Sequence, residues 1–342
     1  MSPEPVSVVI PTYNRAHLLP RAIESVVDAT LPGDEILIVD DGSQDNSEEV
    51  VASFQRRTPD RIRFLRAAHG GAGPARNVGV RAARNPLVAF MDSDDEWMPD
   101  GLHLHRTILG HRRDVVFSFA NLCLRMPNGT ETPHNMVNWH HDTRSWDEIL
   151  GRGVPFSTVA PLPAGRAEFR FHVGDMYLRE LERDYISMIT LVVRRELAGD
   201  ALRFPDDLPI GEDKECLGRL SARGPAAWLD CDTAWNWGHD GPRVSDANTP
   251  TQVENWLIFL QRIWGSDPAF LQKHGDLYAE VLARQYCKRA QWLLVRGRTR
   301  EAREDLRRAR TSPLSYRLLA ALPGFMTKGL LGMRRLLSRS VA

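Results

Sequence analysis

The sequence lacks the features that mark membrane-spanning, secreted and disulfide-stapled proteins. Its 342 residues include only four cysteines, with no Cys-x-x-Cys pair among them, at positions Cys123, Cys216, Cys231 and Cys287. Such scattered cysteines exclude a disulfide framework or a four-cysteine zinc site and fit a reducing compartment. No apolar run reaches the about 18 residues that a spanning helix needs, and the first residues, Met-Ser-Pro-Glu-Pro, do not resemble a signal peptide. We therefore expect a cytoplasmic protein.

An excess of charge of one sign is also missing, since 44 Lys and Arg balance 44 Asp and Glu. Net charge therefore predicts no nucleic-acid partner. The charges are unevenly spread, because residues 296–342 hold 12 basic and 3 acidic side chains. A basic tail of this kind, rich in Leu, Phe and Met, predicts peripheral association with the inner face of the plasma membrane. A helix that packs its apolar side on the protein body is the alternative.

The first 95 residues alternate short apolar runs with amphipathic segments. The runs at 6–10, 35–39, 62–65 and 87–91 predict strands, and the spacing of apolar residues predicts helices at 18–26, 47–54 and 75–83. Alternation of this kind predicts an α/β fold with a mostly parallel sheet and flanking helices.

The pattern changes along the rest of the chain. Further strands are expected at 115–124, 189–193 and 228–229, whereas residues 126–176 show little periodicity and are rich in Gly, Pro, His, Asn and Trp. Irregular stretches of this kind often carry substrate contacts. Beyond residue 249 the spacing is helical. We therefore expect one domain over 1–248, with a donor half of about 1–125 and an acceptor half of about 126–248, and a helical C-terminal region over 249–342.

Acidic residues follow two of the predicted strands. Asp40 and Asp41 come after the second strand, and the fourth strand ends in Asp92-Ser93-Asp94-Asp95. Ligands bind at the carboxyl ends of strands in open α/β sheets, and hard divalent cations prefer carboxylate oxygens. The spacing therefore fits a site for a divalent cation, and it fits a solvated turn with helix-capping acids equally well.

Five short motifs occur in one order along the chain. They are Val8-Val9-Ile10-Pro11-Thr12-Tyr13-Asn14, Ile38-Val39-Asp40-Asp41-Gly42-Ser43, Ala75-Arg76-Asn77-Val78-Gly79, Met91-Asp92-Ser93-Asp94-Asp95 and Gly211-Glu212-Asp213. This order resembles family 2 glycosyltransferases with the GT-A, Rossmann-like nucleotide-sugar-binding fold. The resemblance covers residues 6 to about 245 and implies an inverting enzyme of the bacterial surface-glycan type.

The resemblance implies a role for each motif. Residues that would contact the nucleotide sugar, either its base, ribose or phosphates, are Pro11, Thr12, Tyr13, Asp41, Arg76, Asp92, Ser93 and Arg243. A divalent cation, Mn²⁺ or Mg²⁺, would be held by Asp94, Asp95 and His239, with the choice among the three aspartates left open. Taken alone, Asp41 reads as an ordinary turn residue and Arg76 as a surface arginine.

The resemblance assigns the transfer step to Gly211-Glu212-Asp213. Asp213 would remove the proton of the acceptor hydroxyl, and Glu212 would orient the acceptor or a loop. On spacing alone, an acidic helix N-terminus is the simpler interpretation.

The expected function is metal-dependent transfer of a sugar from a nucleoside diphosphate, a UDP- or dTDP-sugar, to a glycan or lipid-linked hydroxyl. Two alternatives share these features: a non-catalytic nucleotide-sugar or glycan-binding protein of the same fold, and a sugar nucleotidyltransferase. The intact acid at Asp213 argues against the first, and the missing Gly-rich basic loop after the first strand argues against the second.

Overall fold

The computed structural model describes residues 3–208, 210–238, 250–309 and 314–322. The chain divides into two compact units, residues 1–241 and 242–342. Each unit is considered by itself below. The predicted boundary at residue 248 stays a prediction.

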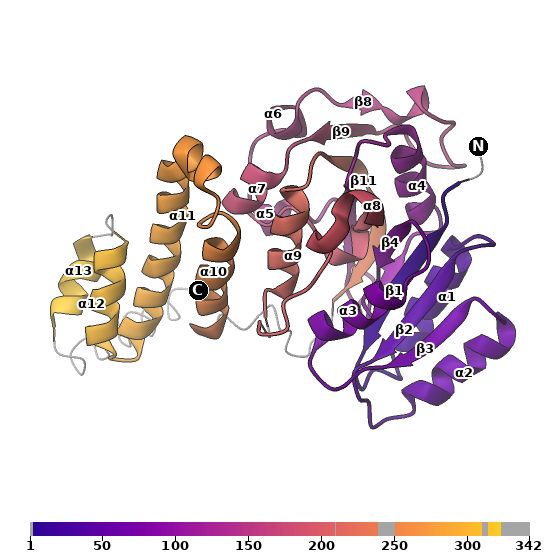
Figure 1. Ribbon diagram of the computed structural model, residues 1–342, viewed down its shortest axis with the longest axis horizontal. Coiled ribbons are helices and arrows are strands. Elements are labelled where there is room, and N and C mark those ends of the chain that lie inside the picture. Colours follow the sequence, from indigo (N-terminus) through magenta and orange to yellow (C-terminus); the bar gives the residue numbers. More distant parts are fainter. Residues whose placement is uncertain (1–2, 209, 239–249, 310–313, 323–342) are drawn as a thin grey trace. The chain divides into compact units, whose positions relative to one another are not determined.

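Unit 1 is built on one 11-stranded sheet with the order β3-β2-β1-β4-β10-β6-β11-β9-β8, to which β5 adds on β11 and β7 on β6. The first strands and helices are β1 (Val6–Thr12), α1 (Leu19–Ala29), β2 (Glu35–Asp40), α2 (Ser47–Arg57), β3 (Ile62–Arg66), α3 (Ala72–Ala82), β4 (Leu87–Phe90), β5 (Glu96–Trp97) and α4 (Gly101–His111). Strands β1 to β4 are mutually parallel where they pair. The predicted α/β architecture is confirmed (Figure 1).

The second part of unit 1 adds mixed strand pairs and short helices. Its regular elements are β6 (Phe117–Arg125), β7 (Glu131–Thr132), α5 (Val137–His140), α6 (Trp146–Leu150), β8 (Val154–Pro155), β9 (Arg170–Gly174), α7 (Tyr177–Glu182), β10 (Val192–Arg194), α8 (Arg195–Ala198), α9 (Glu212–Ser221) and β11 (Ala226–Trp237), with 3-10 turns at Phe156–Thr158, Met188–Thr190 and Gly199–Ala201. Strand β10 runs antiparallel to both β4 and β6, whereas β11 is parallel to β6.

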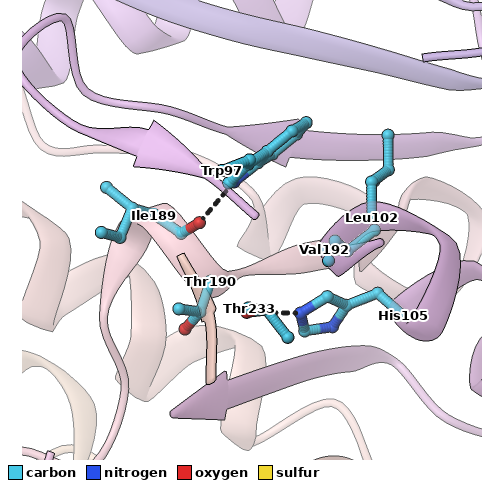
Figure 2. Close-up of a pocket in the computed structure, with 8 residues that line it drawn as sticks. Trp97, Leu102, His105, Ile189, Thr190, Val192 and Thr233 are labelled. Atoms are coloured by element: carbon cyan, nitrogen blue, oxygen red, sulfur yellow. Dashed lines mark hydrogen bonds between the residues drawn. The ribbon is translucent and has the colours of Figure 1, made fainter. Parts of the chain in front are cut away.

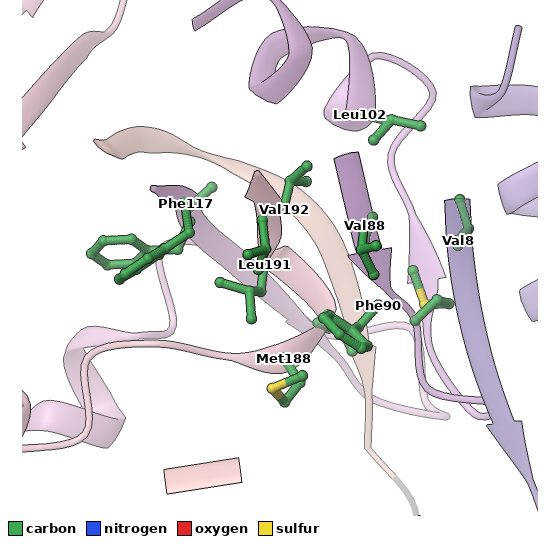
Figure 3. Close-up of a cluster of buried hydrophobic side chains, with 14 of the residues drawn as sticks. Val8, Val88, Phe90, Leu102, Phe117, Met188, Leu191 and Val192 are labelled. Carbon is green, nitrogen blue, oxygen red and sulfur yellow. The ribbon is translucent and has the colours of Figure 1, made fainter. Parts of the chain in front are cut away.

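Burial explains why the first strands read as unbroken apolar runs. Every residue of β1, β2 and β4 is buried, as expected for parallel strands that are covered on both faces. In Figure 3, Val88 and Phe90 of β4 lie beside Val192 of β10 and Phe117 of β6, so one core spans both parts of the sheet.

A glycine sets the distance between α3 and the sheet. A Cβ added at Gly79 would lie 2.4 Å from Cγ1 of Val9 in β1. The helix therefore packs directly on the strand, which brings Arg76 and Asn77, one turn earlier, to the carboxyl edge of the sheet.

Three predicted elements differ from the structure. The strand expected at 189–193 is a 3-10 turn followed by β10, because Thr190 hydrogen-bonds back to Ser187 rather than to a neighbouring strand. The short strand expected at 228–229 extends over 12 residues, with register shifts on either side of Asp232. Helix α3 begins at Ala72, three residues before the predicted start at 75.

Unit 2 is helical throughout its described residues. It contains α10 (Pro250–Ile263), α11 (Pro268–Val295), α12 (Thr299–Arg308) and α13 (Leu314–Ala321). Asp267 caps α11 by accepting a hydrogen bond from the Phe270 N–H at 2.9 Å. Apolar residues of α11 and α12 pack together, and Arg289 of α11 pairs with the buried Asp305 of α12 at 2.6 Å. Among the described residues, no helix combines the length and apolar character that crossing a membrane requires.

Candidate active site

The parallel strands deliver polar residues to one edge of the sheet. Thr12 pairs with Asp40 in the register of β1 and β2, and the Asp41 N–H donates to the Thr12 carbonyl at 2.9 Å. The Met91 N–H donates to the Val9 carbonyl at 3.1 Å, which carries Asp92 to the same edge. The pairing of the strands therefore brings Asp41 and the segment that begins at Asp92 to the same edge of the sheet, where the sequence analysis expected them.

Asp41 is buried and organises the loop before α3. Its Oδ1 accepts from the Gly70 N–H at 2.9 Å and its Oδ2 from the Gly71 N–H at 2.8 Å. His69 Nδ1 lies 3.0 Å from Oδ2, and the His69 ring stacks on Tyr13 with centroids 4.4 Å apart. Tyr13 and His69 are exposed, so the edge offers a flat aromatic surface next to a carboxylate.

The Thr12 side chain adds an unusual polar group to this edge. Thr12 is buried, and its Oγ1 has no hydrogen-bond partner among the described residues. Buried hydroxyls in proteins are normally paired. The Thr12 hydroxyl is therefore an exception among the buried polar groups at this edge.

The three aspartates after β4 point to three different partners. Asp92 Oδ1 accepts from Arg76 at 2.8 Å, and Asp94 Oδ2 accepts from Arg15 at 2.9 Å. Asp95 is buried and accepts from the Trp237 N–H at 2.8 Å. Ser93, between them, is also buried. As a result, no three His, Cys, Asp or Glu side chains converge as a metal-binding group in the part of the chain that the structure describes.

Electrostatics nevertheless favours a cation here. Burial, followed by the negative charges of Asp94 and Asp92, raises the pKa of Asp95 well above its usual range, against hydrogen bonds from Trp237 and Asn236. A positive charge would relieve this repulsion. Mg²⁺-type ions are commonly held by one or two carboxylates, with substrate phosphates as further ligands. The residues present fit a cation that shares its ligands with a bound phosphate.

Arg76 joins the acid cluster to a distant part of the chain. Its Nη2 donates to Asp92 and its Nη1 donates to Glu212 Oε1 at 3.1 Å. The guanidinium is buried, which disfavours its charge, but Asp92 and Glu212 together raise the pKa of Arg76. Burial, followed by the charge of Asp213, raises the pKa of Glu212 to about 7, with Arg76 opposing the shift.

The neighbouring Asn77 fixes the segment that leads to α9. Its Nδ2 donates to the Phe204 carbonyl at 2.8 Å, and its Oδ1 accepts from the Phe204 N–H at 2.9 Å. Gly211, at φ +83°, then allows the tight entry into α9, whose first turn carries Glu212 and Asp213. Arg76 and Asn77 thus hold the first turn of α9, which carries Glu212 and Asp213, close to Asp92.

Asp213 itself lies half-buried in this first turn. A helix N-terminus favours a negative charge. His239 and Arg243, the two remaining predicted site residues, lie outside the described residues.

Comparison with known proteins identifies the domain. Residues 7–161 match the model of the family described as Glycosyl transferase family 2. Residues 7–161 therefore form a glycosyltransferase family 2 domain. The resemblance is confirmed over this stretch, which holds four of the five motifs, and Gly211-Glu212-Asp213 lies beyond it.

Two curated relatives illustrate how far the similarity of this family 2 domain extends. The chain is 47% identical over 97 residues to the uncharacterized glycosyltransferase alr2836 of Nostoc, covering 28% of this chain and 30% of that protein. It is 32% identical over 117 residues to an Escherichia coli protein, covering 34% of this chain and 45% of the relative. That relative is named UDP-Glc:alpha-D-GlcNAc-diphosphoundecaprenol beta-1,3-glucosyltransferase WfgD. The chain thus spans less than half the length of these relatives.

Solved structures share the fold over a longer stretch. Staphylococcus aureus TarS 1–349 in complex with UDP-GlcNAc aligns with a TM-score of 0.59 at 19% identity, covering 92% of this chain and 91% of that one. GalNAc-T7 with UDP, GalNAc and Mn²⁺ aligns with a TM-score of 0.59 at 15% identity, covering 83% of this chain and 51% of that one. The GT-A fold, expected from the motifs, is confirmed.

Several residues that shape this edge escaped the sequence analysis. Arg15 follows β1 and Arg21 lies on α1, whereas Asn236 and Trp237 come from the end of β11. Arg21 Nη2 donates to the Asp94 carbonyl at 2.7 Å and lies 4.0 Å over the Trp237 ring. The sequence motifs gave no indication of these contacts, because the contacting residues lie far apart along the chain.

A closed hollow elsewhere in the domain is part of the core. Trp97 of β5 and His105 of α4 both point toward it (Figure 2), and it has no room for a water molecule. Burial lowers the pKa of His105 to about 3, so the ring is neutral and bonds to the Ser118 hydroxyl at 2.9 Å. His103 is exposed on the other side of α4.

Proposed function

We propose that the protein is a metal-dependent, inverting glycosyltransferase that moves a sugar from a UDP- or dTDP-sugar to a hydroxyl of a glycan or lipid-linked acceptor. The observation that carries the proposal is the double ion pair of Arg76. It joins Asp92, on the expected donor side, to Glu212, next to the expected base Asp213. One buried guanidinium therefore contacts both a carboxylate proposed to lie near the donor and a carboxylate next to the proposed base.

The donor lies along the carboxyl edge of the sheet in this proposal. The base stacks near Tyr13 and is recognised by Asp41 and by backbone groups of Pro11 and Thr12, whose unpaired Oγ1 gains a partner. Asp92 and Ser93 lie near the ribose. Since Arg76 already holds two carboxylates, its main role is to fix them relative to each other, and a donor contact by Arg76 stays a secondary prediction.

The leaving group sits at the aspartates after β4. Asp94 and Asp95 would hold a divalent cation, with His239 as a further candidate ligand and Arg243 as a phosphate contact. Such a cation would neutralise charge that builds on the departing diphosphate. Structures of the fold with UDP and Mn²⁺, such as GalNAc-T7, support a cation of this kind.

Transfer is a single displacement. Asp213 accepts the proton of the acceptor hydroxyl as that oxygen attacks the anomeric carbon, while the bond to the diphosphate breaks. Glu212 pairs with Arg76 and thereby fixes the position of the neighbouring Asp213. The name of WfgD, with its UDP-Glc donor and diphosphoundecaprenol-linked acceptor, supports a UDP-sugar and a lipid-linked acceptor. Acceptor contacts are assigned to residues 126–248 of the proposed 1–248 domain.

The experiment that tests this function is an analysis of released nucleotides with a panel of UDP- and dTDP-sugars, Mn²⁺ and lipid-linked acceptors. Free nucleoside diphosphate supports the proposal. Pyrophosphate indicates nucleotidyl transfer, and donor binding without either product indicates a binding protein. Either of these two outcomes would overturn the proposed function.

Two substitutions assign the roles. Asp213→Asn is expected to retain UDP binding and to lose transfer by about 100-fold or more, because only the base is removed. Asp94→Asn is expected to lose Mn²⁺-dependent UDP binding. Asp200→Asn is the matched control, since the Asp200 side chain is 92% exposed. Near-normal transfer by Asp213→Asn would place the base elsewhere.

A peripheral membrane contact is the last part of the proposal. In unit 2, Arg303, Arg307 and Arg317 line a cavity of about 450 Å³ with Leu306 and Ala320 as apolar neighbours. Arginine beside apolar surface suits anionic lipid headgroups. Co-sedimentation with phosphatidylglycerol vesicles but not phosphatidylcholine vesicles is expected, and it should weaken in Arg303→Glu/Arg307→Glu. The tail beyond residue 322 lies outside the described residues.

A further inference from the structure

Asp94 is bound by a side chain that is accessible to solvent. Its carboxylate pairs with Arg15 at 2.9 Å, and the two side chains are 38% and 28% exposed. Arg76, by contrast, is 7% exposed and holds two carboxylates. Water and salt screen an exposed ion pair, which therefore contributes little to stability. The Arg15–Asp94 pair can open without disturbing the fold.

The backbone on both sides of this pair is fixed. The Asn14 N–H donates to Ser43 Oγ and the Ala16 N–H donates to Asp45 Oδ2, each at 2.9 Å. The Arg21 guanidinium holds the Asp94 carbonyl in place at 2.7 Å. Because the backbone on both sides is tied down, Arg15 can change partner by rotation of its side chain.

A cation at Asp94 makes the present pairing unfavourable. A guanidinium and a divalent cation that share one carboxylate repel each other at close range. A nucleoside diphosphate that arrives with the cation brings several negative oxygens, and arginine binds phosphate oxygens with two parallel hydrogen bonds. Arg15 therefore has a better partner once the donor is present.

We propose that Arg15 is a donor-binding residue that exchanges partners, holding the Asp94 carboxylate in the empty site and the donor diphosphate when a cation occupies Asp94. This inference rests on the proposed function. It assigns a task to a residue that none of the motif assignments includes. It also gives the Asp94 carboxylate a positively charged partner before the cation binds.

The exchange predicts opposite effects on two ligands. In Arg15→Ala, Asp94 loses its competitor, so Mn²⁺ alone should bind more tightly, by about threefold or more. The same variant loses a charged contact to the diphosphate, so UDP in the presence of Mn²⁺ should bind about tenfold or more weakly. A merely structural ion pair would not move the two affinities in opposite directions.

The experiment measures Mn²⁺ binding by electron paramagnetic resonance and UDP binding at saturating Mn²⁺ by calorimetry. The full chain is compared with Arg15→Ala, Arg15→Lys and the control Arg57→Ala, which removes the exposed pair between Arg57 and Glu24. Arg15→Lys keeps the charge but not the paired hydrogen bonds, so both affinities should lie between those of the full chain and Arg15→Ala. Arg57→Ala should match the full chain.

Three results would overturn the inference. Unchanged affinities in Arg15→Ala would make the pair a passive surface contact, and a loss of both together with a lower melting temperature would make it structural. If the unaltered chain binds no UDP with Mn²⁺ and releases no nucleoside diphosphate, the proposed function fails first and the inference with it. If only the partner exchange by Arg15 fails, the unaltered chain still releases nucleoside diphosphate, so the two failures can be told apart.

Discussion

The two parts of unit 1 are stabilised in different ways. In residues 6–111, buried parallel strands and the helices between them follow each other at short range, and the strand pairing brings Thr12, Asp41 and Asp92 to one edge. In residues 117–238, short helices and irregular segments are tied together by side chains. Asp142 binds both Arg144 and Tyr185, and Trp146 stacks on Trp228 at 4.0 Å.

The difference shows how the candidate site is assembled. The first part presents the carboxylates, and the second part has to be fastened to it so that Asp213 faces them. Arg76 and Asn77, on α3 of the first part, make the fastening contacts to Glu212 and Phe204. A change at this connection should therefore affect both stability and chemistry, whereas a change inside either part should affect one of them.

The largest effect is expected for Arg76→Met, which removes the connection. Asp92 and Glu212 lose their shared cation, and breaking a buried ion pair costs about 3–5 kcal/mol. Chemical unfolding should report a loss of this size, and transfer of sugar should fall below detection. Arg57→Met breaks the exposed Arg57–Glu24 pair and should cost less than about 1 kcal/mol. A similarly small loss for Arg76→Met would show that the two parts are held together elsewhere.

The same contrast explains what could be predicted from the sequence. The four parallel strands and their terminal acids were predictable, because apolar runs and the residues that follow them are local patterns. The contacts that complete the site are not local. Arg15 and Asp94 are 79 residues apart, Arg76 and Glu212 are 136 apart, and Asn236 and Asp95 are 141 apart. Spacing cannot tell which of many arginines meets a given carboxylate.

The second part escaped prediction for a related reason. Residues 126–176 showed little periodicity because, apart from β9, their regular elements are two-residue strands and helices of four or five residues. Their order comes from rings and ion pairs contributed by distant segments, such as Arg166, which binds Asp100 and the Asp232 carbonyl. The family motifs compensated in part, since they singled out Glu212 and Asp213 without any contact information.

A smaller effect is expected for Trp146→Ala, which tests the second part alone. The Trp146 ring stacks on Trp228 and meets the edges of Phe119 and Tyr185, so its removal should cost about 3 kcal/mol. UDP affinity, measured by calorimetry where the variant is folded, should not change. Trp139→Ala is the control, because Trp139 is 41% exposed. Loss of UDP binding in Trp146→Ala would mean that the donor edge depends on the second part.

At neutral pH and above, the smallest change in stability is expected for Glu180→Gln, whose effect is mainly on the pH dependence of the second part. Glu180 lies buried on α7, and burial raises its pKa to about 8 from an ordinary value of 4.5, with Lys214 opposing and Asp184 adding to the shift. Because the folded pKa is the higher one, the native state binds the extra proton. Stability should then fall as pH rises from about 4.5 to about 8, by at most about 1.4 kcal/mol per pH unit.

Glutamine mimics the protonated acid and can still accept the hydrogen bond from the Tyr185 N–H. Unfolding curves recorded between pH 5 and pH 8 should therefore show a shallower decline for Glu180→Gln than for the unaltered chain. The pKa of Glu212 is also raised in the folded protein, so Glu212 should contribute to the same decline in stability with pH. Part of the decline should therefore remain in Glu180→Gln and disappear in the double variant Glu180→Gln/Glu212→Gln. Glu49→Gln, at an exposed position on α2, is the control. Parallel slopes for Glu180→Gln and Glu49→Gln would show that Glu180 is already ionised in the folded protein, held so by Lys214.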